Sequence, residues 1–357
     1  MTQTINFENS YCPLPLVPKD QIVLGHGSGG RMTYNLIKDV FLQAFGNPIL
    51  EAGNDFASVP LPQAAKSKGR LTISTDAHVI TPIQFPGGDI GRLAVSGTVN
   101  DISMSGGIPL YLTVSFILEE GLSINLLKEI AFSMKRTAEE VEVQIIAGDT
   151  KVVEKGKADQ IFITTCGIGW IPPGREISGD QAQEGDVVIL SGEIAAHGIA
   201  VLAARGELKF QTTIVSDLAP LNQLVAVLLQ AAPHTHVLRD PTRGGLATVL
   251  NEIAQQSRVG IKLDEEEIPI KKEVKSACEI LGFDPLYVAN EGKFVAILPK
   301  SERDAALKAL SSHPLGKSAR QIGIVDQENP SRVTMKTLIG GTRIVDMLGG
   351  EMLPRIC

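Results

Sequence analysis

The sequence predicts an α/β protein with two domains, on the basis of three observations. The chain has 357 residues, which suits two domains of roughly 100–200 residues each. Aromatic residues make up only 4% of the chain, so the cores must consist mainly of Val, Ile, Leu and Ala. Short apolar runs alternate with stretches of helical periodicity in both halves. The break Ile171-Pro-Pro-Gly174 separates the halves, and we expect domains over residues 1–170 and 175–346.

The first half contains a regular series of apolar segments. They are a helix with Met32, Leu36, Val40 and Phe41 on one face, strands over 71–74, 110–118, 143–147 and 161–170, and a helix or buried segment over 93–102. Ser123 is a good N-cap for a further helix before the third strand. We expect the first and third strands to end at Thr75-Asp76 and Gly148-Asp149-Thr150.

The second half continues the alternation and ends in a tail. The expected elements are strands over 186–190 and 294–298 and helices over 195–204, 221–232, 246–255 and 302–310. The last eleven residues, Met347–Cys357, contain two glycines and a proline. We therefore expect a flexible tail that carries a terminal cysteine.

Composition argues against several classes of protein. A net charge of −7 is unfavourable for a general nucleic-acid binder, which neutralises phosphates with basic residues. The first ten residues lack a basic region followed by an apolar one, so we expect no signal peptide, and no apolar run reaches the roughly 18 residues of a membrane span. The four cysteines lie far apart without a CxxC pair, which fits neither a zinc site nor a disulfide framework: Cys12, Cys166, Cys278 and Cys357. We expect a cytoplasmic protein that binds neither nucleic acid nor membrane.

A glycine-rich segment follows the short apolar run at residues 22–24. Gly25, Gly27 and Gly30 satisfy G-x-G-x-x-G, and Glu51 lies about twenty residues further on, as in a dinucleotide-binding fingerprint. The preceding run is short for a strand, however, and the segment around Glu51 is a poor second strand. Consecutive glycines also expose N–H groups that can hold phosphate. A dinucleotide site, a structural turn and a phosphate loop of another fold all remain open.

Aspartates stand at the ends of several apolar segments: Asp55, Asp76, Asp101, Asp149 and Asp240. One such residue is usually a turn or cap residue, but five suggest a common site. Magnesium is often held by a few carboxylates together with substrate phosphates. Glycines near Asp101 and Asp240 would let the backbone approach a polyanion closely.

Cys357 is a poor core residue because it ends a glycine-containing tail. An exposed thiol could ligate a metal, take part in redox chemistry or carry a covalent group. The absence of a nearby second Cys or His weakens the first two explanations. We interpret His78 and His197 as structural histidines.

Seven segments together resemble the HypE family of hydrogenase maturation factors, which are carbamoyl dehydratases of the aminoimidazole ribonucleotide synthetase superfamily. They are His26-Gly-Ser-Gly-Gly30, Phe85-Pro-Gly-Gly-Asp-Ile90, Gly97-Thr-Val-Asn-Asp101, Ala147-Gly-Asp-Thr-Lys151, Arg239-Asp-Pro-Thr-Arg-Gly-Gly245, Ala289-Asn-Glu-Gly292 and Pro354-Arg-Ile-Cys357. The resemblance implies a homodimer joined through the sheets of the N-terminal domains, with ATP bound near the dimer interface and an α/β C-terminal domain.

The resemblance also implies a reaction. ATP phosphorylates the oxygen of a carbamoyl group on Cys357, and loss of phosphate leaves a thiocyanate that supplies cyanide ligands to the [NiFe]-hydrogenase iron. The implied cofactors are ATP and Mg²⁺, and the implied partners are a HypF-like carbamoyltransferase and a HypC–HypD-like iron scaffold. Matching motifs assign Cys357, Lys151 and Glu291 to catalysis, Asp55, Asp101 and Asp240 to metal, and Gly27, Ser28, Gly29, Gly30, Asp76, Asn100, Asp149 and Thr150 to ATP and phosphate.

The chain departs from the family pattern at two histidines. His197 follows Ala196 where the family usually has an acidic residue, so we leave it out of the site, and His78 replaces a more frequent aromatic residue. Three other functions stay open. They are phosphate transfer to a free small molecule, which has no use for Cys357, a non-catalytic nucleotide-binding adaptor, and a dinucleotide-dependent oxidoreductase.

Overall fold

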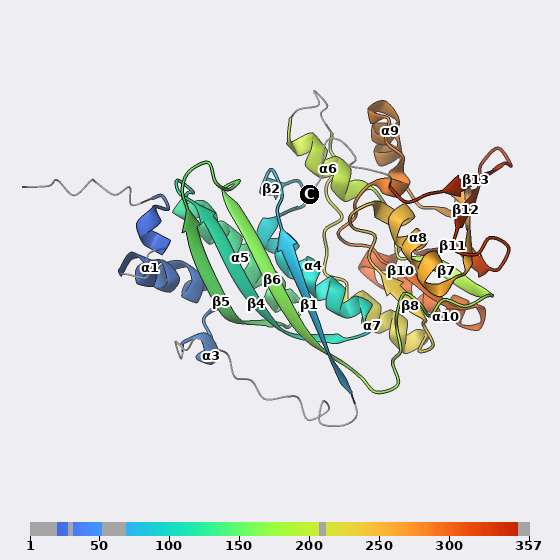
Figure 1. Cartoon of the computed structure of the whole chain (residues 1–357), viewed down its shortest axis with the longest axis horizontal. Helices are drawn as coiled ribbons and strands as arrows, with labels where there is room; N and C mark the ends of the chain where they lie inside the picture. Colours follow the sequence, from blue (N-terminus) through green and yellow to red (C-terminus); the bar gives the residue numbers. More distant parts are fainter. Residues whose placement is uncertain (1–19, 28–30, 52–68, 207–211, 349–357) are drawn as a thin grey trace, which may run out of the picture.

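The computed structural model describes residues 20–27, 31–51, 69–206 and 212–348. Two β-sheets lie one after the other along the longest axis of the molecule, each with its own helices (Figure 1). The first sheet has four strands and the second has seven. The two-domain α/β architecture expected from the sequence is confirmed, whereas the expected domain bounds stay predictions.

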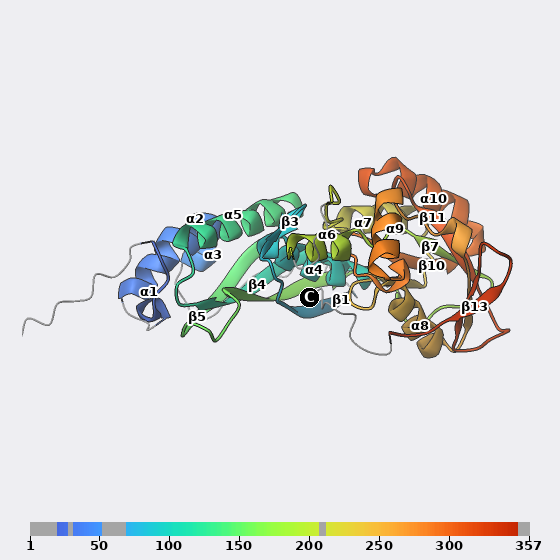
Figure 2. The ribbon, with the colours of Figure 1, turned by 90° about the horizontal axis from the view of Figure 1, so that it is seen from above.

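In the part of the chain that the structure describes, the first sheet has one covered and one open face. Its strands are β1 (Arg70–His78), β4 (Ile108–Glu119), β5 (Gln144–Val153) and β6 (Ile161–Ile171), in the order β1-β6-β4-β5. Helices α4 (Ile90–Met104) and α5 (Ile124–Glu140) lie on the same side of it (Figure 2). Side chains two residues apart on a strand point to the same face. Phe116 and Leu118 of β4 both point to the covered face and are buried under the helices. Leu71 and Ile73, by contrast, are 53% and 66% exposed.

Short elements complete the first domain. They are η1 (Leu24–Gly27), α1 (Arg31–Leu36), η2 (Ile37–Phe41), α2 (Leu42–Phe45), α3 (Pro48–Glu51) and the hairpin of β2 (Gln84–Phe85) and β3 (Gly88–Asp89). Leu36, Val40 and Phe41 are buried, as the helical pattern predicts. The Ser123 hydroxyl accepts the N–H of Leu126 and caps α5, which confirms that assignment.

Two strands are longer than the sequence predicts. Both β1 and β5 continue through the aspartates that we expected to end them, so Asp76 pairs with Thr165 and Asp149 pairs with Ser115. The expected ends were wrong because β1 and β5 are the outer strands of the sheet. Polar residues are common on outer strands, where they discourage pairing with other chains.

The second sheet has the strand order β13-β12-β9-β11-β7-β10-β8. Its strands are β7 (Asp186–Leu190), β8 (Val237–Arg239), β9 (Gly260–Asp264), β10 (Val295–Pro299), β11 (Arg320–Asp326), β12 (Val333–Lys336) and β13 (Thr342–Val345). Its helices are α6 (Ala196–Ala204), α7 (Asn222–Ala231), α8 (Gly245–Ser257), α9 (Lys272–Leu281) and α10 (Arg303–Ser312), with short turns η4 (Glu265–Glu267), η5 (Pro285–Tyr287), η6 (Lys300–Glu302) and η7 (Pro314–Gly316). The predicted elements of this half are all present, but the sequence analysis misses β8, β9, α9 and β11 to β13.

Two further features concern the described part of the chain. Cys166 and Cys278 are free thiols there. Its helices are too short or too polar for any of them to span a bilayer.

Candidate active site

Four of the predicted acidic residues lie together where the two domains meet. Asp76 is on β1, Asp101 is on α4, and Asp240 and Glu291 are on the loops after β8 and before β10. The charges of Asp76, Asp101 and Asp240 all act on Glu291. We call these four residues the carboxylate cluster.

Asp101 is held by strand β1. The Ser74 hydroxyl donates to Oδ2 of Asp101 at 2.7 Å. Burial raises the pKa of Asp101, although the Ser74 hydrogen bond works in the opposite direction, and the charge of Asp76 raises it further. Asp101 therefore lies in a site that favours a proton or a cation on its carboxylate.

Asp76 and His78 face helix α4 at Gly97. A Cβ atom at Gly97 would lie 3.4 Å from Asp76 Oδ2 and 3.3 Å from His78 Cε1, so the glycine makes room for both side chains. His78 Nε2 lies 3.1 Å from Thr165 Oγ1 and 3.6 Å from Asp76 Oδ2. Burial lowers the pKa of His78. These contacts agree with a neutral, structural histidine.

Asp240 lies on the loop Arg239–Gly245, which depends on its two glycines. Gly244 and Gly245 have φ angles of 76° and 63°, and a Cβ atom at Gly245 would lie 2.5 Å from the Leu286 carbonyl oxygen. Burial raises the pKa of Asp240 to about 7, and the charge of Asp101 contributes.

Glu291 is the most strongly perturbed member of the carboxylate cluster. Burial, followed by the charges of Asp240 and Asp217, raises the pKa of Glu291 well above its usual value. Its main-chain N–H donates to Asp217 Oδ1 at 3.3 Å, and its carbonyl oxygen accepts the N–H of Ala219 at 3.4 Å. The loop that carries this carboxyl group is thus bound to the segment before α7.

Asn100 joins the two domains. Its Oδ1 accepts the N–H of Leu221 at 2.7 Å, and its Nδ2 donates to the carbonyl oxygens of Ala219 and Glu291 at 3.2 and 3.4 Å. Its assignment as a phosphate ligand stays a prediction.

The motif on β5 lies away from the carboxylate cluster. The side chains of Lys151 and Asp149 are 67% and 62% exposed, with Lys151 Nζ 3.3 Å from Asp149 Oδ2. Lys151 pairs with Ile117, which is exposed on the open face of the sheet, whereas Asp76 pairs with Thr165, which is buried on the covered face. Lys151 and Asp149 therefore lie on the opposite outer strand and on the opposite face from Asp76, and Thr150 lies between them on the same strand.

Several predicted site residues fall outside the described part of the chain. They are Ser28, Gly29, Gly30, Asp55 and Cys357. Gly27 ends the 3-10 helix η1, and among the described residues before this helix, 20–23, the β-structure is a single bridge between Gln21 and Ser123. A dinucleotide fingerprint requires a strand at that place, so this alternative loses its structural support.

The donor set of the carboxylate cluster fits a magnesium ion only in part. Within residues 20–27, 31–51, 69–206 and 212–348, no three His, Cys, Asp or Glu side chains form a ligand set by themselves. Asp101 and Asp240 nevertheless supply the hard carboxylate oxygens that Mg²⁺ prefers. These two residues could bind an ion whose other ligands are water and nucleotide phosphates.

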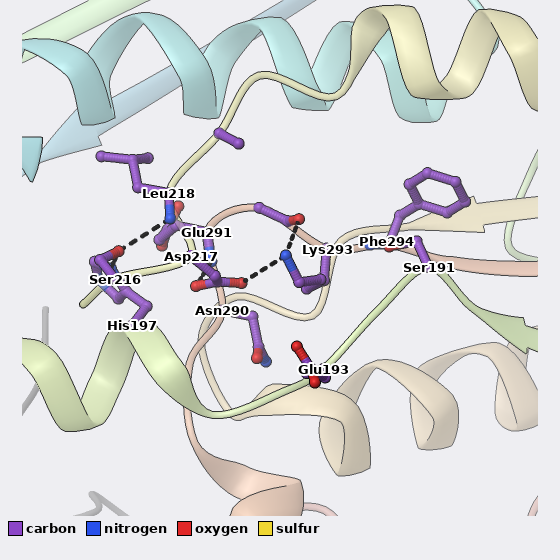
Figure 3. A network of polar contacts seen from close by, with 12 residues as sticks. Ser191, Glu193, His197, Ser216, Asp217, Leu218, Asn290, Glu291, Lys293 and Phe294 are labelled. Carbon is purple, nitrogen blue, oxygen red and sulfur yellow. Dashed lines mark hydrogen bonds and ion pairs between the residues drawn. The ribbon is translucent and has the colours of Figure 1, made fainter. Parts of the chain in front are cut away.

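Two charged side chains beside Glu291, Asp217 and Lys293, were not predicted from the sequence, whereas His197 was interpreted as structural and left out of the site (Figure 3). Asp217 Oδ2 lies 3.6 Å from Lys293 Nζ, and the two side chains are only 6% and 11% exposed. His197 is fully buried, with Nδ1 2.8 Å from Ser216 Oγ, and burial lowers its pKa to about 4. The contact between Asp217 and Lys293 joins distant positions, and no local sequence pattern marks it. Their burial together is visible only in the structure.

A cleft of about 720 Å³ lies elsewhere, on the second sheet between β9, β11 and α10. Its basic residues include Lys262, Arg320 and Lys336, each paired with an acidic side chain. None of the predicted site residues lines it, so it does not belong to the candidate site.

Two family descriptions match the chain. "AIR synthase related protein, N-terminal domain" matches residues 53–171, and "AIR synthase related protein, C-terminal domain" matches residues 183–336. Together they cover most of both sheets.

Similar proteins include one curated relative and two solved structures. The protein named carbamoyl dehydratase HypE from Cupriavidus necator is 52% identical over 341 residues, which is 96% of either chain. The crystal structure of hydrogenase maturation protein HypE in complex with ATP has 47% identity and a TM-score of 0.88, covering 94% of this chain and 99% of that chain. HypE in a HypE–HypF complex has 48% identity and a TM-score of 0.76, covering 88% and 99%.

Proposed function

The chain belongs to the HypE family of carbamoyl dehydratases, and we propose that it converts a carbamoyl group on Cys357 into a thiocyanate with ATP. The observation that carries this proposal is the carboxylate cluster at the domain junction, formed by residues of the motifs that the family shares. The thiocyanate carbon would become a cyanide ligand of the [NiFe]-hydrogenase iron. Phosphate transfer to a free small molecule is the weaker alternative, because it leaves the terminal cysteine without a role.

The reaction removes one water in two steps. The carbamoyl oxygen attacks the γ-phosphorus of ATP, ADP leaves, and the nitrogen loses its first proton to give an S-bound imidate phosphate. Loss of the second N–H proton then forms the C≡N bond and expels inorganic phosphate. The protein must therefore stabilise the phosphoryl charge and accept protons.

Glu291 suits the role of proton acceptor. Burial, followed by the charges of neighbouring acids, raises the pKa of Glu291, so its carboxylate holds a proton more tightly than that of an exposed glutamate. Lys151 lies where water solvates its ammonium group. We propose that Glu291 accepts the N–H protons of the carbamoyl group and that Lys151 stabilises the phosphoryl charge.

Asp101 and Asp240 are the proposed magnesium ligands, together with Asp55. A bound Mg²⁺ would neutralise charge on the β- and γ-phosphates. The proposed phosphate contacts are Gly27, Ser28, Gly29, Gly30, Asp76, Asn100, Asp149 and Thr150. The raised pKa values of Asp101 and Asp240 support a cation beside these two carboxylates, since burial and neighbouring acids both disfavour their bare negative charge.

A homodimer would bring the two parts of the site together. Lys151 is on the outer strand β5, whereas Asp101 is bound to Ser74 of the other outer strand, β1. The two side chains therefore do not share a site within one protomer. The exposed Leu71 and Ile73 make the open face a suitable surface for a second copy. A two-fold axis through stacked open faces could set β5 of one protomer beside β1 of the other, where Lys151 would reach the carboxylate cluster past the edge of this outer strand. We propose that each ATP site is shared in this way.

The proposed partners follow from the family. The similar HypE–HypF complex supports a HypF-like carbamoyltransferase that loads Cys357. A HypC–HypD-like scaffold would accept the cyanide, and the cytoplasm would keep the thiol reduced. The proposed organisation comprises an ATP-binding and dimerisation domain over 1–170, an α/β domain over 175–346 and a flexible tail over 347–357.

The tail provides the test of this function. A chain that lacks Met347–Cys357 should bind ATP but should form no thiocyanate after incubation with a HypF-like carbamoyltransferase, a carbamoyl donor and ATP. Cys357→Ser should also form none, because the oxygen ester is a different acceptor. Thiocyanate or cyanide-ligand formation by the truncated chain would favour the free-substrate alternative.

A further inference from the structure

The segment formed by residues 216–221 runs between the two domains and is bound to the first. The Ser216 N–H donates to the Pro86 carbonyl oxygen at 2.8 Å in the β2–β3 hairpin. The Leu221 N–H donates to Asn100 Oδ1 on helix α4 at 2.7 Å. Both ends of this segment are therefore fixed to the domain that contains Asp76 and Asp101.

The same segment holds the loop that carries Glu291. Asp217 Oδ1 accepts the Glu291 N–H, and the Ala219 N–H donates to the Glu291 carbonyl oxygen. At Gly292, a Cβ atom would lie only 1.9 Å from the Asp217 carbonyl oxygen. The main chain on both sides of the Glu291 side chain is thus packed directly against residues 216–221.

One ammonium group connects these contacts. Lys293 Nζ donates to the Gly292 carbonyl oxygen at 2.8 Å and lies 3.6 Å from Asp217 Oδ2 (Figure 3). Within the described residues, Asp217 Oδ2 is buried and has no hydrogen-bond partner. Lys293 is therefore the charge that compensates this carboxylate, and it also binds the carbonyl oxygen of Gly292, the residue after Glu291.

A buried ion pair of this kind contributes little net stability, because desolvation of both charges offsets most of their attraction. Its contacts instead fix the orientation of the loop. We propose that Asp217 and Lys293 are positioning residues that set the main chain of residues 290–292, and through it the Glu291 carboxyl group, against the first domain. This inference rests on the proposed function for the catalytic role of Glu291 but not for the contacts themselves.

The test is a double-mutant cycle on the pair. Lys293→Gln leaves Asp217 without its counter-charge, and Asp217→Asn does the same to Lys293. Each change should lower kcat about 10- to 100-fold, because a small displacement of a catalytic group has effects of this size. KM for ATP should stay within about twofold, since neither residue is placed at the nucleotide. The double variant should recover much of the lost kcat, because both charges are gone and the amide oxygen that Asp217→Asn introduces still accepts the Glu291 N–H.

Hydrogen exchange gives a readout that does not depend on catalysis. Exchange of the peptide that contains residues 290–293 should accelerate in Lys293→Gln and return towards the wild-type rate in Lys293→Arg. Lys262→Gln is the matched control, since Lys262 forms a 3.0 Å ion pair with Asp326 on the second sheet. It should change neither kcat nor exchange at residues 290–293.

The outcomes separate this inference from the proposed function. A folded Lys293→Gln chain with wild-type kcat and wild-type exchange would overturn the positioning role. A rise in KM for ATP in both single variants, without a fall in kcat, would also overturn the positioning role. It would indicate instead that the two residues contact the nucleotide. If the wild-type chain formed no thiocyanate, the proposed function would fall, while faster exchange in Lys293→Gln would still support the contact.

Discussion

Ser74 and Asp101 belong to different elements, and the Ser74 hydroxyl on β1 donates to the Asp101 carboxylate on α4 at 2.7 Å. This hydrogen bond sets a half-buried carboxylate at an outer strand of the first sheet. Asp101 faces the loops of the second domain there, and its charge raises the pKa of both Asp240 and Glu291. The charge of Asp101 on the first domain thus acts on ionisable groups of the second domain.

Asp101→Ala should abolish ATP turnover without unfolding the protein. We expect a fall of about 100-fold or more, because the variant loses a carboxylate from the proposed phosphoryl-transfer site. The Tm should stay within about 3 °C, since burial raises the pKa of Asp101 and so disfavours its ionised form in the folded chain. Coupled measurement of ADP release and thermal unfolding checks both statements.

Asp304→Ala is the matched control for this substitution. Asp304 is on α10, and its side chain is 83% exposed. The variant should keep both turnover and Tm. Full activity of Asp101→Ala would remove Asp101 from the site.

The sequence predicted the helices and central strands of the first domain because their apolar periodicity is strong. It did not predict the full length of β1 and β5, because an outer strand can carry Asp76 or Asp149 without breaking. It therefore placed both aspartates after strands and grouped them in one site. The pairing order of the strands, which separates them, depends on contacts between distant positions.

Stability should depend on pH through Asp240. Burial raises its pKa from 3.8 to about 7, so the folded state keeps a proton that the unfolded chain loses between these values. The free energy of unfolding should therefore fall as the pH rises through this window and remain lower above it. His197 contributes with the opposite sign, because its pKa is lowered from 6.5 to about 4.

Comparison with Asp240→Asn isolates the contribution of this carboxyl group. Urea unfolding at about pH 5 and pH 8 should show a larger loss of stability for the wild-type chain than for the variant, since asparagine does not ionise. Equal losses would mean that Asp240 titrates normally. Both measurements are made without nucleotide and magnesium.

Gly292→Ala should disturb the loop that carries Glu291. The added methyl group would lie 1.9 Å from the Asp217 carbonyl oxygen, so the backbone must move. We expect a loss of about 1–3 kcal/mol in stability and a clear fall in kcat. Gly341→Ala is the control, because its nearest neighbour would be Thr337 Oγ1 at 3.4 Å. Equal stability and turnover in both variants would contradict the tight packing at Gly292.

Mixed dimers test whether two protomers share each ATP site. Asp101→Ala and Lys151→Ala should each be inactive alone, since each lacks one part of both sites. Half of the randomly mixed dimers contain both variants, and a shared site would leave one of their two sites intact, so about a quarter of wild-type turnover should return. No recovery in mixtures that light scattering shows to be dimeric would place both residues in the same protomer.

The candidate site was predictable where its residues lie in distinctive short segments. Asp101, Asp240 and Glu291 stand beside glycines in loops or at the end of a helix, and the structure brings them together. Asp217 and Lys293 were not predictable, because neither has a local pattern and their contact joins two distant parts of the sequence. Ionisable side chains that a fold buries together become visible only in three dimensions.

The most direct test of the account is the intact mass of the chain during turnover. After incubation with a HypF-like carbamoyltransferase, a carbamoyl donor and magnesium, the chain should carry one carbamoyl group, and fragmentation should locate it on Cys357. Addition of ATP should then remove one water from that adduct, and Glu291→Gln should keep the carbamoyl group unchanged. A wild-type chain that stays carbamoylated while it hydrolyses ATP, or that loses water at another residue, would contradict dehydration on the terminal cysteine.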